Sequence, residues 1–286
     1  MIDRIKKIAV IGSGTMGQGI AHTCAAAGYT VLLYDIEATL LKASLSRMRK
    51  NLEMLVEKGK ISSTESQATL GRITPVSDFR QLQVDLAIEA VIENLEVKQK
   101  LFQEIEKLND PDCILTTNTS SIPVTRIGAA LKHPQRFAGL HFFNPAPVMK
   151  LVEIVRGGGT ADATIQLLKD FTVRLNKQFV IAQDSPGFIV NRVARHFYLE
   201  PLKILEENVA DFKTVDTLLK STGFKMGPFE LMDLIGIDVN LSVTQSMYNS
   251  FNQEPKFRPS RIQQQKVDAG HLGRKTGLGF YVYEKA

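Results

Sequence analysis

The chain has 286 residues, of which 44% are hydrophobic and 23% charged, a composition typical of globular proteins rather than disordered ones. Lys and Arg total 35 against 30 Asp and Glu, and the net charge of +5 is too small and too scattered to indicate nucleic-acid binding. No segment is apolar enough to span a bilayer, and the first residues lack the features of a presequence. Only Cys24 and Cys113 are present, which suits a reducing compartment. We therefore expect a cytoplasmic protein of bacterial type, and a processed organellar matrix protein would begin in the same way.

Short apolar runs alternate with amphipathic stretches over the first two thirds of the chain. Residues 8–11 predict a buried strand that ends at a glycine, a helix follows over about 16–27, and residues 31–35 predict a second strand. Further strands are expected near 72–76, 85–91, 113–117, 137–142, 151–155 and 179–182, with helices at 94–108 and 162–175. This alternation predicts an α/β fold with a Rossmann-type, doubly wound sheet.

The second and third predicted strands are separated by a long stretch without strand signal. Apolar residues recur there at helical spacing, so we predict a helical hairpin over about 38–70, inserted into the sheet domain. Its polar face is basic and holds Lys42, Arg47, Arg49, Lys50, Lys58 and Lys60. A solvated surface is the ordinary role of such a run, and binding of phosphate groups is the functional alternative.

The pattern changes after Pro186-Gly187. From there to the end the sequence predicts helices and loops, with strand potential only at 279–283. We therefore predict a first domain over residues 1–185 and an all-α C-terminal domain over 186–286. The segment 188–208 predicts one long helix despite Pro201, and its apolar residues on several sides make one side a candidate dimer contact.

The motif Gly12-Ser-Gly14-Thr-Met-Gly17 lies between the first predicted strand and the first helix. Gly12 permits a tight turn, Gly14 lets the backbone approach a pyrophosphate, and Gly17 lets the helix pack close to the strand. Asp35 ends the second strand about 18 residues beyond Gly17, where an acid can bind both ribose hydroxyls and repel a 2′-phosphate. A structural glycine turn is the alternative, but the strand, helix and acid together favour binding of NAD over NADP.

Polar residues follow two later strands. Thr117-Asn118-Thr119-Ser120-Ser121 comes directly after the strand at 113–117, where ligands bind in such sheets, although a helix cap or turn explains the same residue types. His141 ends another strand, and Glu153 lies in the apolar run 151–155, where a carboxylate needs a partner. A His–Glu pair would fix the imidazole tautomer and raise its basicity, whereas a hydrogen-bonded structural histidine is the alternative.

Asn191 falls in the first turns of the long helix that follows the predicted boundary. An amide at an apolar helix start needs a hydrogen-bond partner, which either a substrate or the backbone would supply.

These motifs together resemble the 3-hydroxyacyl-CoA dehydrogenase family over nearly the whole chain. The matching strings are Gly12-x-Gly14-x-x-Gly17, Ile88-Glu-Ala-Val-Ile-Glu93-Asn, Asn118-Thr-Ser120-Ser, His141-Phe-Phe-Asn144-Pro, Pro186-Gly-Phe-Ile-Val-Asn191-Arg, Met226-Gly-Pro-Phe-Glu-Leu-Met-Asp233 and Gly273-Arg-Lys-Thr-Gly-Leu-Gly-Phe-Tyr281. The resemblance implies an NAD-dependent enzyme of fatty acid metabolism that oxidises a short (S)-3-hydroxyacyl-CoA, such as 3-hydroxybutyryl-CoA, to the 3-oxoacyl-CoA.

The resemblance also implies roles for individual residues. His141 would be the base that removes the hydroxyl proton, Glu153 would orient it, and Ser120 and Asn191 would bind the substrate oxygen. The residues implied to contact or support the cofactor are Gly12, Gly14, Met16, Gly17, Asp35, Glu93, Lys98, Asn118 and Asn144. Asn51 and Lys58 fall near the family's coenzyme A contacts, no metal is implied, and a homodimer through the C-terminal helical domain is expected.

Two other functions fit parts of the pattern. A dehydrogenase of a sugar acid such as gulonate shares the architecture and many of the motifs. A non-catalytic NAD-binding protein would keep the fold, but the retention of His141, Glu153 and both polar partners argues against it. The predicted partners are thus an acyl-CoA substrate and a second copy of the chain, with neither nucleic acid nor membrane.

Overall fold

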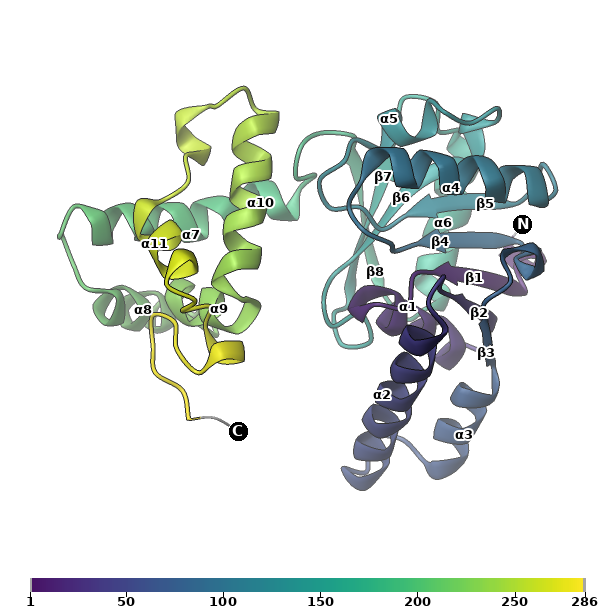
Figure 1. Cartoon of the computed structure of the whole chain (residues 1–286), viewed down its shortest axis with the longest axis horizontal. Helices are drawn as coiled ribbons and strands as arrows, with labels where there is room; N and C mark the ends of the chain where they lie inside the picture. The colour runs from purple at the N-terminus through teal and green to yellow at the C-terminus, as the bar shows by residue number, and fades with distance from the viewer. Residues whose placement is uncertain (1, 285–286) are drawn as a thin grey trace. The chain divides into compact units, whose positions relative to one another are not determined.

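The computed structural model describes residues 2–284, which form two compact units divided between Ser185 and Pro186 (Figure 1). The first unit carries a mixed sheet, and the second is helical. The predicted fold class, a Rossmann-type sheet followed by an all-α region, is confirmed. No helix within residues 2–284 combines the length and apolarity needed to cross a bilayer.

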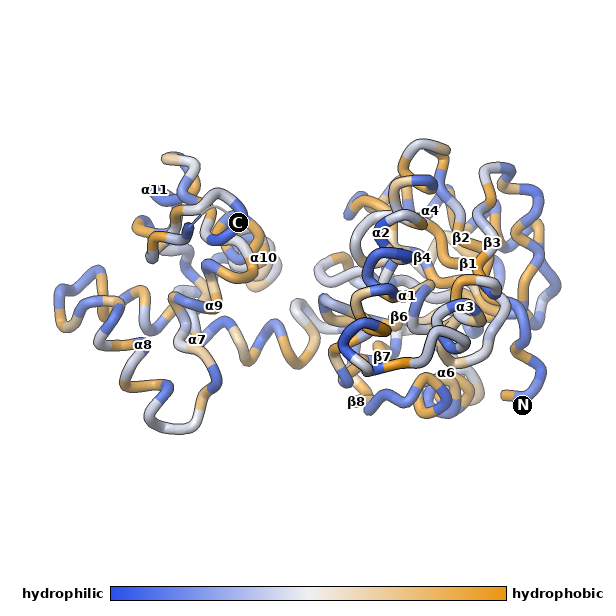
Figure 2. The backbone as a smooth tube through the Cα atoms, turned by 90° about the horizontal axis from the view of Figure 1, so that it is seen from below, coloured by the Kyte–Doolittle hydropathy of each residue, from blue (hydrophilic) through white to orange (hydrophobic). Residues whose placement is uncertain are grey.

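The sheet of the first unit has eight strands in the order β3-β2-β1-β4-β5-β6-β7-β8. Their bounds are β1 (Lys7–Ile11), β2 (Thr30–Tyr34), β3 (Ile73–Val76), β4 (Leu86–Glu89), β5 (Ile114–Thr117), β6 (Phe137–Phe142), β7 (Leu151–Arg156) and β8 (Gln178–Gln183). The central strands β1, β4 and β5 are almost entirely buried, which explains the apolar residues in each of them. Figure 2 shows β1 in the orange of hydrophobic residues. The strand order reverses between β1 and β4, the point at which such sheets bind ligands.

One pair of strands breaks the parallel pattern. β6 and β7 are antiparallel, and their register sets His141 directly opposite Glu153. An antiparallel pair needs no crossover helix, so a short loop over residues 143–150 suffices to join the two strands.

Helices cover both faces of the sheet. Their bounds are α1 (Thr15–Ala26), α2 (Ala38–Glu57), α3 (Ser63–Gly71), α4 (Leu95–Leu108), α5 (Val124–Gly128) and α6 (Asp162–Arg174). Residues of α1 and α6 share one apolar core, in which Tyr29 contacts Phe171. On the other face Phe102 of α4 packs edge-on against Phe137 of β6, and Figure 1 shows α4 in front of the sheet.

The predicted hairpin consists of α2 and α3. Buried residues of α2 recur at helical spacing, among them Leu41, Met48 and Leu52. α3 begins with a reciprocal cap, because the Ser62 hydroxyl accepts from the Glu65 N–H and the Glu65 carboxylate accepts from the Ser62 N–H. Figure 1 shows the two helices projecting together from the sheet.

The second unit contains α7 (Val190–Glu206), α8 (Phe212–Ser221), α9 (Pro228–Ile235), α10 (Ile237–Ser250) and α11 (Arg261–Asp268). The long helix predicted over 188–208 thus begins two residues later, and Pro201 lies buried inside it. The strand potential at 279–283 gives only isolated bridges, at Leu278 with Gly273 and Val282, rather than a strand. The reason is that the N–H groups of Phe280 and Tyr281 donate to the Asp233 carboxylate, at 2.9 Å each, instead of to a neighbouring strand.

Two buried acids hold this unit together. Asp216 accepts from the N–H groups of Phe229 and Glu230 at the start of α9, and from the Tyr281 hydroxyl. Asp233, 1% exposed, accepts from the closing segment, where a Cβ on Gly279 would lie 2.1 Å from its Oδ1. Asp233 and Gly279, from the last two matching strings, therefore serve packing.

Candidate active site

The glycine-rich loop joins β1 to α1 beside the β1/β4 reversal. Gly12 has φ of +101°, and a Cβ there would meet the Ala90 carbonyl at 2.5 Å. A Cβ on Gly17 would lie 1.8 Å from the Gly12 carbonyl, so only glycine allows α1 to approach the strand this closely. A Cβ on Gly14, in contrast, has no heavy atom within 4 Å. That open space, before uncapped N–H groups at the start of α1, fits a dinucleotide pyrophosphate.

Asp35 lies directly after β2, within reach of the same loop. Its Oδ2 accepts from the Ser13 N–H at 2.8 Å and from the Ser13 hydroxyl at 2.7 Å, and its Oδ1 accepts from the Glu37 N–H. Burial opposes ionisation, but the hydrogen bonds from Ser13 and Glu37 outweigh it and hold the pKa of Asp35 below its ordinary value. The charge expected to select NAD over NADP is therefore present, and Ser13 is an orienting partner that the sequence did not reveal.

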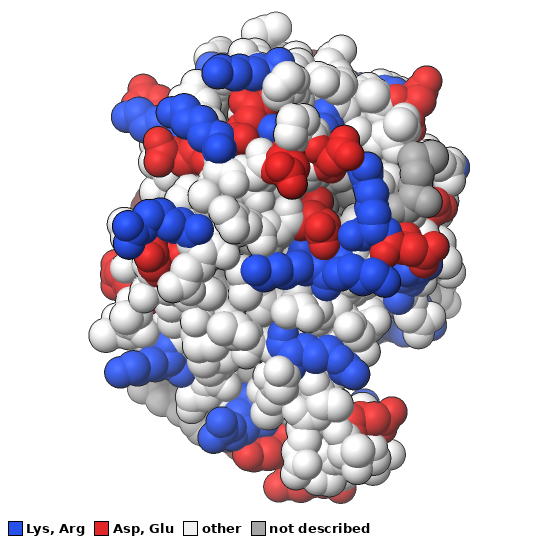
Figure 3. All heavy atoms as spheres, turned by 90° about the vertical axis from the view of Figure 1, so that its right-hand side faces the viewer, with Lys and Arg blue, Asp and Glu red and all other residues white. Residues whose placement is uncertain are grey.

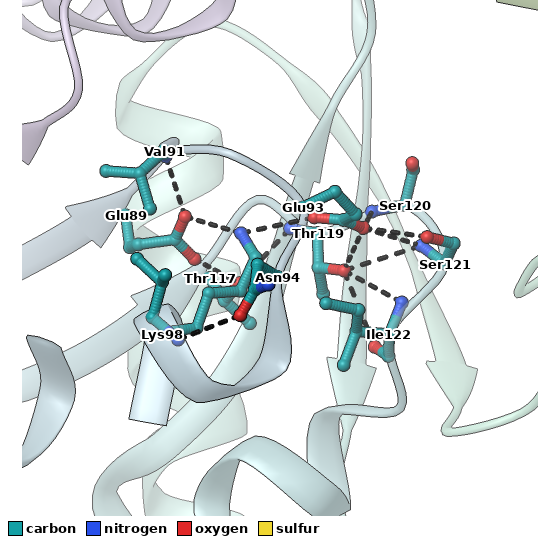
Figure 4. Close-up of polar contacts among 11 residues, drawn as sticks. Glu89, Val91, Glu93, Asn94, Lys98, Thr117, Thr119, Ser120, Ser121 and Ile122 are labelled. Carbon is teal, nitrogen blue, oxygen red and sulfur yellow. Dashed lines mark hydrogen bonds and ion pairs between the residues drawn. The ribbon is translucent and has the colours of Figure 1, made fainter. Parts of the chain in front are cut away.

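A buried charge cluster follows β4 (Figure 4). The Lys98 ammonium lies 2.5 Å from Glu89 Oε1 and 3.2 Å from Glu93 Oε2, and both Lys98 and Glu89 are almost wholly inaccessible. Glu89 also accepts from the Val91 N–H and the Thr117 hydroxyl. The cluster thus brings together the predicted residues Glu93 and Lys98, and adds Glu89, which was not predicted although it too is a carboxylate in an apolar strand.

Glu93 holds the turn that contains Ser120. Its Oε1 accepts from the Thr119 and Ser121 hydroxyls and from the N–H groups of Ser120 and Ser121. Burial raises the pKa of Glu93, but Lys98 and these hydroxyls lower it more, so it lies below the ordinary value. Figure 4 shows the Ser120 side chain pointing away from the Glu93 carboxylate. The turn is therefore fixed by Glu93, while the Ser120 hydroxyl stays available for a ligand.

His141 and Glu153 form a pair at the ends of β6 and β7. His141 Nδ1 lies 2.7 Å from Glu153 Oε2, with His141 6% exposed and Glu153 fully buried. A carboxylate on Nδ1 places the proton there and leaves Nε2 as the basic nitrogen. The parallel pairing of β5 with β6 brings Asn118 near by, and its Oδ1 accepts from the N–H of Phe142, the residue after His141. His141, Glu153 and the Asn118–Ser121 turn thus lie at the same end of the sheet, where hydrogen bonds connect their segments.

The loop after His141 is anchored by a residue not predicted from the sequence. The Lys177 ammonium, on the chain just before β8, donates to the carbonyls of Ala146 and Met149 at 2.7 Å each. Asn144, expected to support the site, lies exposed in this loop. A groove of about 430 Å³ runs between the loop, α1 and α2.

The groove contains both predicted coenzyme A contacts, Asn51 and Lys58, together with Arg47, Lys60 and Asn144. The other basic residues of the hairpin do not line it, so part of the basic face is solvated and part lies at a cavity. On the face drawn in Figure 3, Lys and Arg are interspersed with Asp and Glu rather than gathered into one field.

Asn191 belongs to the second unit, in the first turn of α7, where it is half-buried. Its amide forms no hydrogen bond within the part of the chain that the structure describes, in contrast to Asn118. The amide is therefore available to a ligand, and its role in binding substrate stays a prediction.

Two protein-family models together match nearly the whole chain. The model described as "3-hydroxyacyl-CoA dehydrogenase, NAD binding domain" matches residues 7–185, and that of the "C-terminal domain" of the same enzymes matches residues 187–283. The chain belongs to the 3-hydroxyacyl-CoA dehydrogenase family. The predicted family, NAD as cofactor and the assignment as an oxidoreductase are confirmed.

Individual members of this family are similar over nearly the full chain. A 3-hydroxyadipyl-CoA dehydrogenase of Escherichia coli is 50% identical over 98% of the chain, which spans only 60% of that relative's length. A 3-hydroxybutyryl-CoA dehydrogenase of Bradyrhizobium diazoefficiens is 41% identical over 99% of the chain and 97% of its own length. The crystal structure of (S)-3-hydroxybutyryl-CoA dehydrogenase from Ralstonia eutropha superposes with a TM-score of 0.93 at 36% identity, covering 98% of this chain and all of that one.

Proposed function

We propose that the protein catalyses the reversible oxidation of a short (S)-3-hydroxyacyl-CoA, such as 3-hydroxybutyryl-CoA, to the 3-oxoacyl-CoA. The observation that carries the proposal is the His141–Glu153 pair, whose facing atoms are 2.7 Å apart. The pair lies at the end of the sheet where the Ser120 turn and the glycine-rich loop also follow their strands. Bound NAD supplies the hydride acceptor. The relatives' names support a thioester substrate, with an acyl chain that ends in a methyl group in one case and in a carboxylate in the other.

In this mechanism His141 acts as the general base. Its Nε2 takes the proton of the 3-hydroxyl group, while Glu153 holds the ring in orientation and stabilises the imidazolium that forms. The Ser120 hydroxyl and the Asn191 amide hydrogen-bond the C3 oxygen, which matters most in the reverse reaction, when negative charge builds on that atom. Asn144 supports the site from the loop after His141.

Residues around the cofactor have separate roles in the proposal. Gly12, Gly14, Met16 and Gly17 contact the dinucleotide, and Asp35 binds the adenosine ribose. Glu93 and Lys98 approach the nicotinamide ribose, with Asn118 and Asn144 beside them. The groove at α2 receives coenzyme A, and Asn51 and Lys58 contact it, since cations at a cavity suit its phosphates.

The experiment that tests this function is the oxidation of NADH in the presence of acetoacetyl-CoA, repeated with NADPH. We expect rapid turnover with NADH and at least about tenfold weaker kcat/KM with NADPH, because Asp35 repels a 2′-phosphate. Equal use of both cofactors would remove Asp35 as the selector. Turnover of free 3-hydroxy acids but not of the thioester would instead indicate the sugar-acid reaction, and cofactor binding without any turnover would indicate a non-catalytic protein.

The second unit is proposed to bind substrate and to form the homodimer. Its α7 exposes apolar residues such as Val193, which supports an interface there. A cytoplasmic location fits the two cysteines, both buried and without a disulfide. Light scattering at assay concentration tests the assembly, and a species of monomer mass would contradict it.

A further inference from the structure

Arg195 is a cation buried in the interior of the second unit. It lies on α7 and is 3% exposed. One terminal nitrogen, Nη1, donates to the Asn240 carbonyl and to the Thr244 hydroxyl on α10, at 2.9 Å each. The guanidinium also lies over the Tyr198 ring, 4.8 Å from its centroid.

In the part of the chain that the structure describes, no acid balances this charge. Within residues 2–284 no carboxylate lies within ion-pair distance of Arg195, and burial lowers the pKa of the guanidinium to about 10. A buried charge is costly unless an opposite charge and hydrogen bonds compensate it. The other deeply buried charges of this unit, Asp216 and Asp233, each receive three hydrogen bonds. Arg195 is therefore the exception in its own surroundings.

Several polar atoms around Arg195 also make fewer hydrogen bonds than they could within residues 2–284. Three buried atoms have no hydrogen-bond partner among residues 2–284: Arg195 Nε, Asn240 Nδ2 and Gln263 Oε1. The three residues form one connected group, because Arg195 bonds to Asn240 and the Gln263 amide donates to Asn240 Oδ1 at 2.9 Å. Two of the unused atoms are donors, one of them on a cation. This combination fits the oxygens of an anion, and the unused acceptor fits a water beside it.

The position of Arg195 relates this group to the substrate. Asn191 lies four residues earlier on the same helix, so the two side chains share one face of α7 about one turn apart. Long helical side chains lean toward the helix N-terminus, which is the end of α7 at which Asn191 lies. One helical turn rises about 5.4 Å. An acyl chain held at its C3 oxygen by Asn191 would place an acid group three carbons farther on, at C6, within that reach.

We propose that Arg195 binds a carboxylate at the far end of the acyl chain, so that the preferred substrates are 3-hydroxyacyl-CoA thioesters of dicarboxylic acids of about six carbons. The inference rests on the proposed function, because it takes Asn191 as the ligand of the C3 oxygen. In it, the anion missing from the protein is supplied by the substrate, and Asn240 Nδ2 donates the second hydrogen bond. Arg195 determines specificity and takes no part in the proton or hydride transfer.

The test compares kcat/KM for 3-hydroxyadipyl-CoA and 3-hydroxybutyryl-CoA, with NAD, in the wild type and in Arg195→Met and Arg195→Lys. We expect the wild type to prefer the adipyl thioester, and Arg195→Met to lower its kcat/KM by roughly 10- to 100-fold, as for lost hydrogen bonds to a charged group. The butyryl value should change less than about threefold, and Arg195→Lys, which keeps the charge but not the fork of donors, should fall in between. The matched control is Lys203→Met, a partly exposed cation on the same helix, which should leave the ratio of the two values unchanged.

Two results would overturn the inference while leaving the proposed function intact: a wild type that prefers the butyryl thioester, or an Arg195→Met variant in which both values fall equally. Equal losses would mean that Arg195 only packs α7 against α10. Failure of the wild type to oxidise either thioester would contradict the proposed function itself. A measurement without variants covers the case in which Arg195→Met does not fold. Adipyl-CoA should inhibit the wild type at least tenfold more strongly than hexanoyl-CoA, and equal inhibition would contradict the role of Arg195.

Discussion

In the first unit the buried charges at the site, apart from Lys177, are paired with charges of opposite sign, whereas in the second unit the buried acids are surrounded by backbone N–H groups and tyrosine hydroxyls. Lys98 lies against Glu89, and Glu153 against His141, and both Glu89 and His141 lie at the carboxyl ends of their strands. Asp233 instead accepts from two backbone N–H groups and from the Tyr283 hydroxyl, in residues 47 to 50 positions later in the chain.

The difference indicates two uses of a buried charge. A pair at the end of a strand places a charge or a basic nitrogen at the edge where a ligand binds, and its partner fixes its orientation. An acid that gathers backbone donors from a distant segment fixes that segment, here the closing stretch of the chain, against the helices. Substitutions in the first unit should therefore mainly cost activity, and those at the second unit's acids should mainly cost stability.

The largest expected effect is that of Asp233→Ala on stability. The change leaves two buried N–H groups and the Tyr283 hydroxyl without their acceptor, so we expect the free energy of unfolding to fall by about 4 kcal/mol. Urea denaturation followed by the helical circular dichroism signal measures this, since the chain has no tryptophan to serve as a probe. At low temperature the remaining folded protein should turn over normally.

The control for Asp233 is Asp238→Ala, an acid of the same unit whose partner Lys275 is partly exposed. Exposed ion pairs contribute little, so the loss should stay below about 1 kcal/mol. If Asp233→Ala were no more destabilising than Asp238→Ala, the buried acids of the second unit would not be structural anchors, and the contrast between the units would fail.

The next largest effect is expected at His141. Loss of the general base in His141→Ala should lower kcat/KM at least ~10²-fold, equivalent to roughly 3 kcal/mol of transition-state stabilisation. Alanine also leaves the buried Glu153 carboxylate without its ring partner, so His141→Gln is the sharper variant. Its amide can donate to Glu153 but cannot take up a proton in catalysis.

We expect His141→Gln to lose as much activity as His141→Ala while its free energy of unfolding stays within about 1 kcal/mol of the wild type. Steady-state kinetics and denaturation on the same preparations give both quantities. Near-normal turnover in either variant would remove His141 from the role of base, and a large stability loss in His141→Gln would mean that the pair is structural, as in the second unit.

The fold and one of the two charge pairs of the first unit, that of His141 with Glu153, could be predicted from the sequence. Apolar runs and helical periodicity place every strand within two residues of its bounds, and the signal is clearest for the central strands, which are buried on both sheet faces. The His141–Glu153 pair was predictable because a carboxylate in an apolar strand needs a partner. The same signal at Glu89, in Leu86-Ala-Ile-Glu89, leads to Lys98 and could have revealed that cluster.

The roles of other residues could not be recognised from the sequence. Ser13 binds Asp35, but a serine between two glycines is expected in any tight loop. Lys177 anchors the loop after His141 through two carbonyls, and lysine near a strand end looks like an ordinary surface residue until its burial is known. Arg195 sits at a helix position where a cation normally reaches solvent, and only the packing of α10 and α11 encloses it.

The smallest of the main effects is on stability and is expected at Glu93, whose side chain is 35% exposed, unlike the other members of the Lys98 cluster. Its size would tell how much a partly exposed charge of the first unit contributes. Because the pKa of Glu93 lies below its ordinary value, its ionised form stabilises the folded state at pH values above that ordinary value, about 4.3. This contribution is lost as pH falls through the lower, folded-state pKa.

We expect Glu93→Gln to lower the free energy of unfolding by about 1 kcal/mol at pH 7, a value reduced by solvent screening. The difference in this free energy from the wild type should narrow below about pH 4. Thermal unfolding across this range measures it, with Glu96→Gln, at an exposed glutamate in the first turn of α4, as control. A difference that does not change with pH would show that Glu93 acts through the shape of its hydrogen bonds to residues 119–121 rather than through its charge.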